Sequence, residues 1–254
     1  MNKVFVIAKN TFRETIRDRI VYGIVAFGLL FIGSTVILGT LSLGEDLKVI
    51  RDFGLAGLYI FGFTITVFLG ASLMHKEIAE RTIYLVLSKP VSVFEFLKGK
   101  FLGLCMSVAV ATGVLAVVYL GVVALKGGGF DYLSLVALGL QLEELAIFVA
   151  LAIVLSLLYG PLLSVMYSVC LLYMGHSLDL LVKYGVDSNV RVVHWLTIGI
   201  FYVFPNLEKF NIRNFVIYGH GVSLTVFVGA TVYALCYCGL LLLAAEKIIK
   251  HKEL

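Results

Sequence analysis

Long segments without charge alternate with short polar connections along this chain. Ile20–Gly44 runs for 25 residues without a charged side chain, and Phe53–Met74 and Phe101–Leu125 are also uncharged. A last apolar segment lies within Phe215–Ala245. A helix of about 20 apolar residues is long enough to cross the hydrocarbon core of a membrane. Each segment is therefore predicted to contain a transmembrane helix.

The stretch from 132 to 178 is too long to be a single span. As one helix its 47 residues would measure ~70 Å at ~1.5 Å per residue, against a hydrocarbon core of ~30 Å. Glycine and proline interrupt helices, so Tyr159-Gly160-Pro161 is predicted to separate a fourth span from a fifth. The only charges of the stretch, Glu143 and Glu144, then lie in the outer half of the fourth span or at its outer interface.

Residues 1–19 have an amphipathic pattern. Apolar side chains recur there at helical spacing, opposite polar ones, which predicts an interfacial helix in the cytoplasmic headgroup layer. These apolar residues are Phe5, Ala8, Phe12 and Ile16.

Residues 75–100 concentrate charge and helix punctuation between the second and third spans. A short helix with one polar face is predicted there, and Pro90 cannot continue it. Ser92 followed by Glu95 is a capping-box pattern that starts a second helix, so the segment is predicted to form a rigid elbow. The polar face of the first helix carries Glu77, Glu80, Arg81, Tyr84 and Ser88.

Two connections are expected outside the membrane. Glu45–Asp52 is predicted to be a short outer loop of mixed charge, and residues 181–214 a longer outer segment. Within the longer one, residues 195–204 are ten apolar residues, too few to span and rich in interfacial aromatics. A re-entrant or membrane-skimming helix is predicted there.

Composition agrees with an all-α integral membrane protein of one transmembrane domain, residues 1–254. The chain is 61% hydrophobic and 14% charged, and its length suffices for about six spans without a soluble catalytic domain. Six spans place 13 Lys and Arg inside and 7 outside, whereas five spans would place 14 inside and 6 outside. The positive-inside rule does not separate these topologies. Length and the Gly-Pro break favour six spans with both termini cytoplasmic.

Candidate chemistry is sparse. No segment has the GxxxxGK[ST] pattern, so we expect no nucleotide or other cofactor on this chain and no catalytic residue in it. The net charge of +4 comes mostly from residues beside the spans, which does not indicate a nucleic-acid partner. Metal ligands are not predicted either, although His176, Asp179, His194 and His220 were considered as a transition-metal set.

Two features inside the spans are candidate sites. Glu143 and Glu144 are ionisable residues in a membrane segment, which indicates either a role in transport or helix locking, or a simple headgroup contact. A stripe of small residues on the third span allows close approach of another helix, within the chain or in a dimer. The stripe consists of Gly99, Gly103, Ser107 and Ala111.

Several motifs together resemble those of ABC exporter permeases of the type-2 class, in the branch of multicopper-enzyme maturation permeases. The resemblance extends over most of the chain, including the amphipathic N-terminus. It is most specific in the 75–100 segment and in the motif before the last span. The motifs are Lys76-Glu77-Ile78-Ala79-Glu80-Arg81-Thr82, Leu87-Ser88-Lys89-Pro90-Val91-Ser92, Phe96-Leu97-Lys98-Gly99-Lys100, Tyr159-Gly160-Pro161, Gly175-His176 and the run from Phe204 to Asn214.

This resemblance implies a permease in a prokaryotic cytoplasmic (inner) membrane, working as a homodimer with two separate ABC ATPase subunits that bind ATP and Mg²⁺. The 75–90 helix corresponds to the coupling helix that docks on the ATPase, and similar permeases often carry a glutamate near Glu144. The residues that the resemblance assigns to the ATPase contact are Lys76, Glu77, Glu80, Arg81, Tyr84, Ser88 and Pro90.

Two other functions stay open. The complex would transmit mechanical work to a periplasmic maturation partner docked on residues 181–214, without moving cargo. Alternatively, the chain would be an ion-coupled carrier or an intramembrane enzyme that uses Glu143 or Glu144.

Overall fold

The chain folds into a bundle of helices. The computed structural model describes residues 3–42, 44–79, 91–129, 131–186, 191–218 and 221–251, which are mostly helical and include no strand. Among them, six helices are long and apolar enough to cross a membrane, which confirms the predicted all-α multi-pass membrane protein. They are α2 (Arg19–Thr40), α3 (Asp46–Ala79), α5 (Val93–Val123), α6 (Tyr132–Leu158), α7 (Pro161–Val186) and α10 (Leu224–His251). The shorter elements are α1 (Lys3–Ile16), η1 (Ala124–Gly128), α8 (Arg191–Val203), η2 (Glu208–Phe210) and α9 (Arg213–Tyr218).

Helices α3 and α6 pack against each other at the centre of the bundle. In the most apolar 18-residue stretch of each helix, 61% of the residues are buried in α3 and 56% in α6. The corresponding share is 22% in α2 and in α10. The outer helices expose large apolar side chains such as Leu30, Val117 and Leu235. Exposed apolar surface of this extent is typical of helices in contact with lipid.

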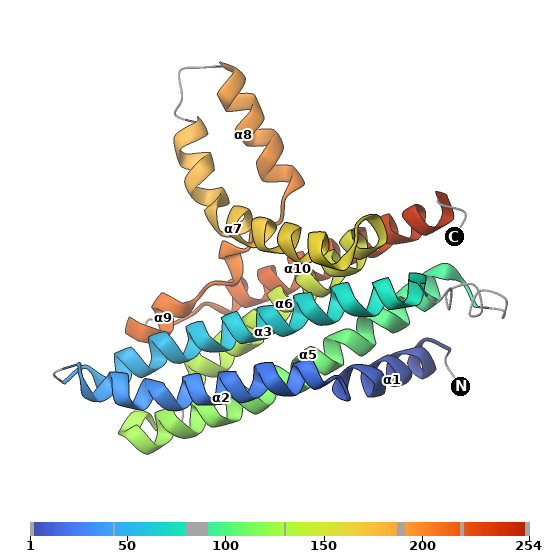
Figure 1. Cartoon of the computed structure of the whole chain (residues 1–254). Helices are drawn as coiled ribbons and strands as arrows, with labels where there is room; N and C mark the ends of the chain where they lie inside the picture. The colour runs from blue at the N-terminus through green and yellow to red at the C-terminus, as the bar shows by residue number, and fades with distance from the viewer. Residues whose placement is uncertain are drawn as a thin grey trace.

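The bundle has two distinct ends (Figure 1). Both termini lie at one end, together with the end of α3 and the start of α5; we call it the terminal end. The α2–α3 connection and α9 lie at the other, which we call the opposite end. Helix α8 packs on α7, and Figure 1 shows α8 and the later part of α7 projecting sideways from the bundle.

A predicted helix break and a predicted helix cap are confirmed. α6 ends at Leu158 and α7 begins at Pro161, so the 132–178 stretch folds back where glycine and proline interrupt it. Gly127 and Gly129 adopt positive φ angles of 86° and 61° after α5, a conformation that glycine reaches without strain. Ser92 and Glu95 form the predicted capping box, with hydrogen bonds of 2.9 and 3.1 Å.

The predicted outer loop Glu45–Asp52 is wrong, because α3 already begins at Asp46. Charge alone had indicated a loop, but two charged side chains in the second turn of α3 have partners. Arg51 pairs with Asp131 at 2.8 Å, and Asp52 pairs with Arg213 at 2.5 Å. These pairs allow the helix to continue beyond its apolar core. Likewise α7 extends to Val186, into the segment predicted as outer loop, and α8 is a helix as predicted for 195–204.

Helix α1 packs along the first half of α5. A Cβ atom on Gly103 would lie 2.6 Å from the Ala8 carbonyl oxygen, and one on Gly99 would lie 2.7 Å from the Ile7 side chain. The Ser107 hydroxyl donates to Thr15 Oγ1 at 3.0 Å. The small-residue stripe thus serves packing within the chain. Small α1 residues turn toward α5, whereas Phe5, expected on the apolar face, stays 58% exposed.

Candidate functional site

A buried glutamate lies midway along α6. Glu144 is only 3% exposed, and most of the other buried side chains of α6 are apolar. The Tyr59 hydroxyl of α3 donates to Glu144 Oε1 at 2.5 Å, and His176 Nε2 of α7 lies 3.1 Å from the same oxygen. One carboxylate therefore joins three candidate spans.

The second nitrogen of the His176 ring faces another carboxylate. His176 Nδ1 lies 3.2 Å from Glu208 Oε2, and the Asn211 amide donates to Glu208 Oε1 at 3.1 Å. With an acceptor at each nitrogen, a protonated ring is placed to donate to both glutamates. We call Tyr59, Glu144, His176 and Glu208 the Glu144 cluster.

The segment before η2 is held against α7 by backbone and side-chain contacts. The backbone N–H of Leu207 donates to the Gly175 carbonyl at 3.2 Å, and a Cβ atom on Gly175 would lie 2.5 Å from the Leu207 side chain. The Asn206 amide donates to Asp179 at 2.6 Å, and Asn206 Oδ1 accepts from the Glu208 backbone at 3.1 Å. The Gly175-His176 and Phe204–Asn214 motifs, distant in the sequence, thus meet at this site.

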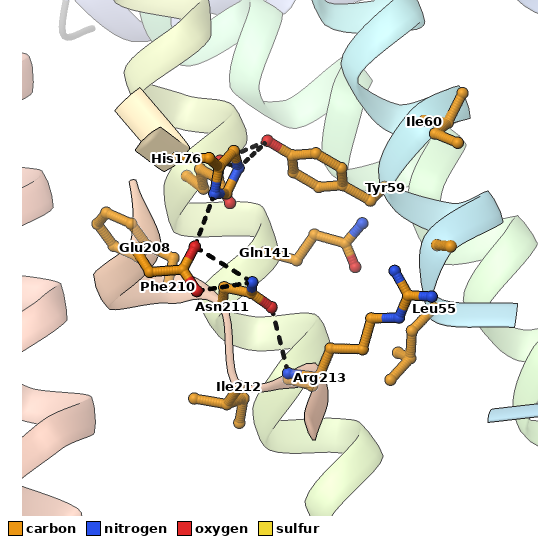
Figure 2. Close-up of a pocket in the computed structure, with 13 residues that line it drawn as sticks. Leu55, Tyr59, Ile60, Gln141, His176, Glu208, Phe210, Asn211, Ile212 and Arg213 are labelled. Carbon is orange, nitrogen blue, oxygen red and sulfur yellow. Dashed lines mark hydrogen bonds and ion pairs between the residues drawn. The ribbon is translucent and has the colours of Figure 1, made fainter. Parts of the chain in front are cut away.

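A cavity of about 290 Å³ opens beside the Glu144 cluster. It lies between α3, α6, α7 and the segment from η2 to α9. Figure 2 shows the labelled Tyr59, His176 and Glu208 side chains gathered on one side of it and the Arg213 side chain on the other. Arg213 is held by its ion pair with Asp52, so its charge is already compensated.

No protein-family model and no curated protein matches this chain.

Glu143 does not belong to the cluster. Its Oε1 accepts from the Thr231 hydroxyl of α10 at 2.7 Å, on another side of α6 from Glu144. Its Oε2 is buried and accepts no hydrogen bond from any described residue. Adjacent residues on a helix point about 100° apart, so the two glutamates meet different neighbours. They do not form one paired acid–base site.

The predicted ATPase-contact residues are only partly within the described residues. Glu80, Arg81, Tyr84, Ser88 and Pro90 lie outside them. Lys76 forms an ion pair with Glu14 of α1 at 3.2 Å, and Glu77 pairs with Lys100 of α5. The Lys100 side chain is only 4% exposed, so this second pair is a buried link between α3 and α5.

Among the described residues, no group of three or more His, Cys, Asp or Glu side chains is placed to hold a metal ion. His220 lies outside the described residues. His176 contacts carboxylates instead, and Asp179 contacts Asn206. Neither Tyr59 nor Glu208 was predicted to be a site residue. A signal for Glu208 was its place in the motif before the last span, but Tyr59 stands in an apolar run without any such signal.

Proposed function

We propose that this chain is the membrane-spanning permease subunit of an ATP-driven exporter of the type-2 class. It works as a homodimer with two copies of a separate ATPase subunit, which binds ATP and Mg²⁺. Two features of the sequence support this proposal: the 75–100 segment resembles the coupling region of such permeases, and no GxxxxGK[ST] motif is present.

The observation that carries the proposal is the joining of α1, α3 and α5 at the terminal end. α3 has 34 residues, or ~51 Å at ~1.5 Å per residue, so it extends well beyond a hydrocarbon core of ~30 Å. The buried Glu77–Lys100 pair ties the end of α3 to α5, and α1 packs along α5. Both ends of the 80–90 connection are therefore held on one rigid unit.

Such a unit suits the transmission of force. A partner that moves residues 80–90 would displace α3 and α5 together instead of bending a loose connection. In this proposal the terminal end faces the cytoplasm of a prokaryotic cell and the opposite end faces outside. Motion at the terminal end then reaches the Glu144 cluster through α3.

Copurification tests the proposal. The charge-reversed double variant E80K/R81E should recover several-fold less of the ATPase subunit, identified by its GxxxxGK[ST] sequence, than the wild-type chain from the native membrane. The matched control E45K/K48E reverses an exposed ion pair of 2.8 Å near the start of α3. Its recovery should equal that of the wild type. Equal recovery with all three chains, or no such ATPase with the wild type, would contradict the proposal.

A second candidate function is favoured by the burial of Glu144 in the cluster. A carboxylate inside a membrane span, hydrogen-bonded to a tyrosine and beside a histidine, is typical of proton or cation pathways. An ion-coupled carrier would transport its substrate in proteoliposomes without any ATPase, and Glu144→Gln would abolish that transport. If the chain is instead an exporter subunit, transport in the same proteoliposome assay should require both the ATPase subunit and hydrolysable ATP.

A further inference from the structure

Carboxylates outnumber the uncompensated basic groups at the cavity beside the Glu144 cluster. Among the described residues that line it, Glu144 and Glu208 are acidic, and His176 lies between them. The one arginine of the lining, Arg213, is compensated by Asp52 at 2.5 Å. Lys209, next to Glu208, lies instead over the Tyr233 ring, 4.4 Å from its centroid. Two carboxylates therefore face a single imidazole.

A buried hydrogen-bond donor lines the same cavity. Gln141 Nε2 is shielded from solvent and has no hydrogen-bond partner among the described residues. Buried polar groups without partners are rare in folded proteins, because they lose their hydrogen bonds to water. The same shielding separates the nitrogen from the open cavity, so Gln141 forms part of the cavity wall and does not donate to a ligand in this arrangement.

The remaining walls are apolar and the cavity is small. Leu55, Ile60, Phe210 and Ile212 contribute them, together with the Tyr59 ring. The volume of about 290 Å³ is near the lower limit of roughly 300–1,000 Å³ for small-molecule pockets. This combination suits a ligand with an apolar body and a few polar atoms.

We propose that the cavity binds a small organic ammonium ion with an apolar body. Glu144 and Glu208 provide the counter-charges, and the apolar walls hold the ligand body. An anion would meet two carboxylates and an arginine that is already paired. Binding is a property of this chain alone, so the inference goes beyond the exporter proposal and does not depend on an ATPase.

Calorimetry on the purified full-length chain, in nanodiscs of zwitterionic lipid, tests this inference with three probes of similar shape. They differ in charge: 2-phenoxyethylamine is a cation, 2-phenoxyethanol is neutral and phenoxyacetate is an anion. Saturable binding of the amine, with at least tenfold weaker binding of the other two, is the expected result. Absence of saturable amine binding, or equal binding of phenoxyacetate, would overturn the inference.

Three variants assign the binding to this cavity. Glu208→Gln removes one counter-charge at a side chain that is 39% exposed, and we expect amine binding to weaken by roughly 10-fold or more, as for a lost charge-assisted hydrogen bond. Ala56→Leu fills the cavity without changing any polar group, and should abolish binding. Glu45→Gln removes a charge away from the cavity and should leave affinity unchanged. Thermal melting verifies that each variant is folded, and unchanged amine affinity in both folded cavity variants would refute the site.

Discussion

Glu143 and Glu144 are adjacent in α6 and have the same side chain, but their surroundings differ. Glu144 contacts Tyr59 and His176 in the centre of the bundle, whereas Glu143 accepts from Thr231 of α10. The difference follows from the rotation of about 100° per residue along a helix. Only Glu144 lines the cavity beside the cluster and links α3, α6 and α7.

The Tyr59 hydroxyl is expected to stabilise the fold through Glu144. Tyr59→Phe leaves the buried Glu144 with one donor fewer, and the free energy of unfolding should fall by about 1–3 kcal/mol. Tyr184→Phe removes the hydroxyl of an exposed tyrosine and serves as the control. Chemical unfolding in detergent measures both. Equal stability of both variants and the wild type would mean that the short contact with Glu144 contributes nothing.

At this scale the sequence predicted Glu144 but not its partners. An ionisable residue in an apolar segment can be recognised without a structure, because its burial is unfavourable without a partner. Tyr59 and Glu144 are 85 residues apart, and His176 and Glu208 are 32 apart. Neither pair follows from local spacing, because helix packing brings these residues together.

At the scale of elements, the contact between α1 and α5 depends on glycine. Gly103→Ala would place a methyl group 2.6 Å from both the Ala8 carbonyl oxygen and Thr11 Cβ, so α1 must shift. Such overpacking should lower the free energy of unfolding by about 1–3 kcal/mol. Gly113→Ala is the matched control on the same helix, because nothing lies within 4 Å of its added Cβ atom.

Unfolding measurements on these two alanine variants test the packing of α1. We expect a loss of stability for Gly103→Ala and none for Gly113→Ala. If both variants are as stable as the wild type, α1 does not pack on α5 as described. A loss confined to Gly113→Ala would instead place the contact on another face of α5.

Hydropathy and punctuation predicted the existence of the spans better than their ends. The break at Tyr159–Pro161 and the Ser92–Glu95 cap depend on local backbone chemistry, so the sequence was sufficient. The start of α3 depends on ion pairs with Asp131 and Arg213, residues distant in the sequence. A charged stretch with distant partners therefore looked like a loop.

At the scale of the whole molecule, the two ends of the bundle have different chemistry. The terminal end holds α1, α3 and α5 together around the buried Glu77–Lys100 pair. The half toward the opposite end holds the segment from η2 to α9, which borders the cavity. In the proposed exporter, an ATPase moves the terminal end, while small molecules bind in the cavity toward the opposite end. α3 extends from one end to the other and joins the two.

Site-specific photocrosslinking tests this division most directly. A benzoylphenylalanine at Tyr84, in the proposed coupling helix, should crosslink in native membranes to a protein with the GxxxxGK[ST] motif. The same group at Tyr218, exposed on α9 at the opposite end, should not. An ATPase crosslink from Tyr218 but none from Tyr84 would contradict the account.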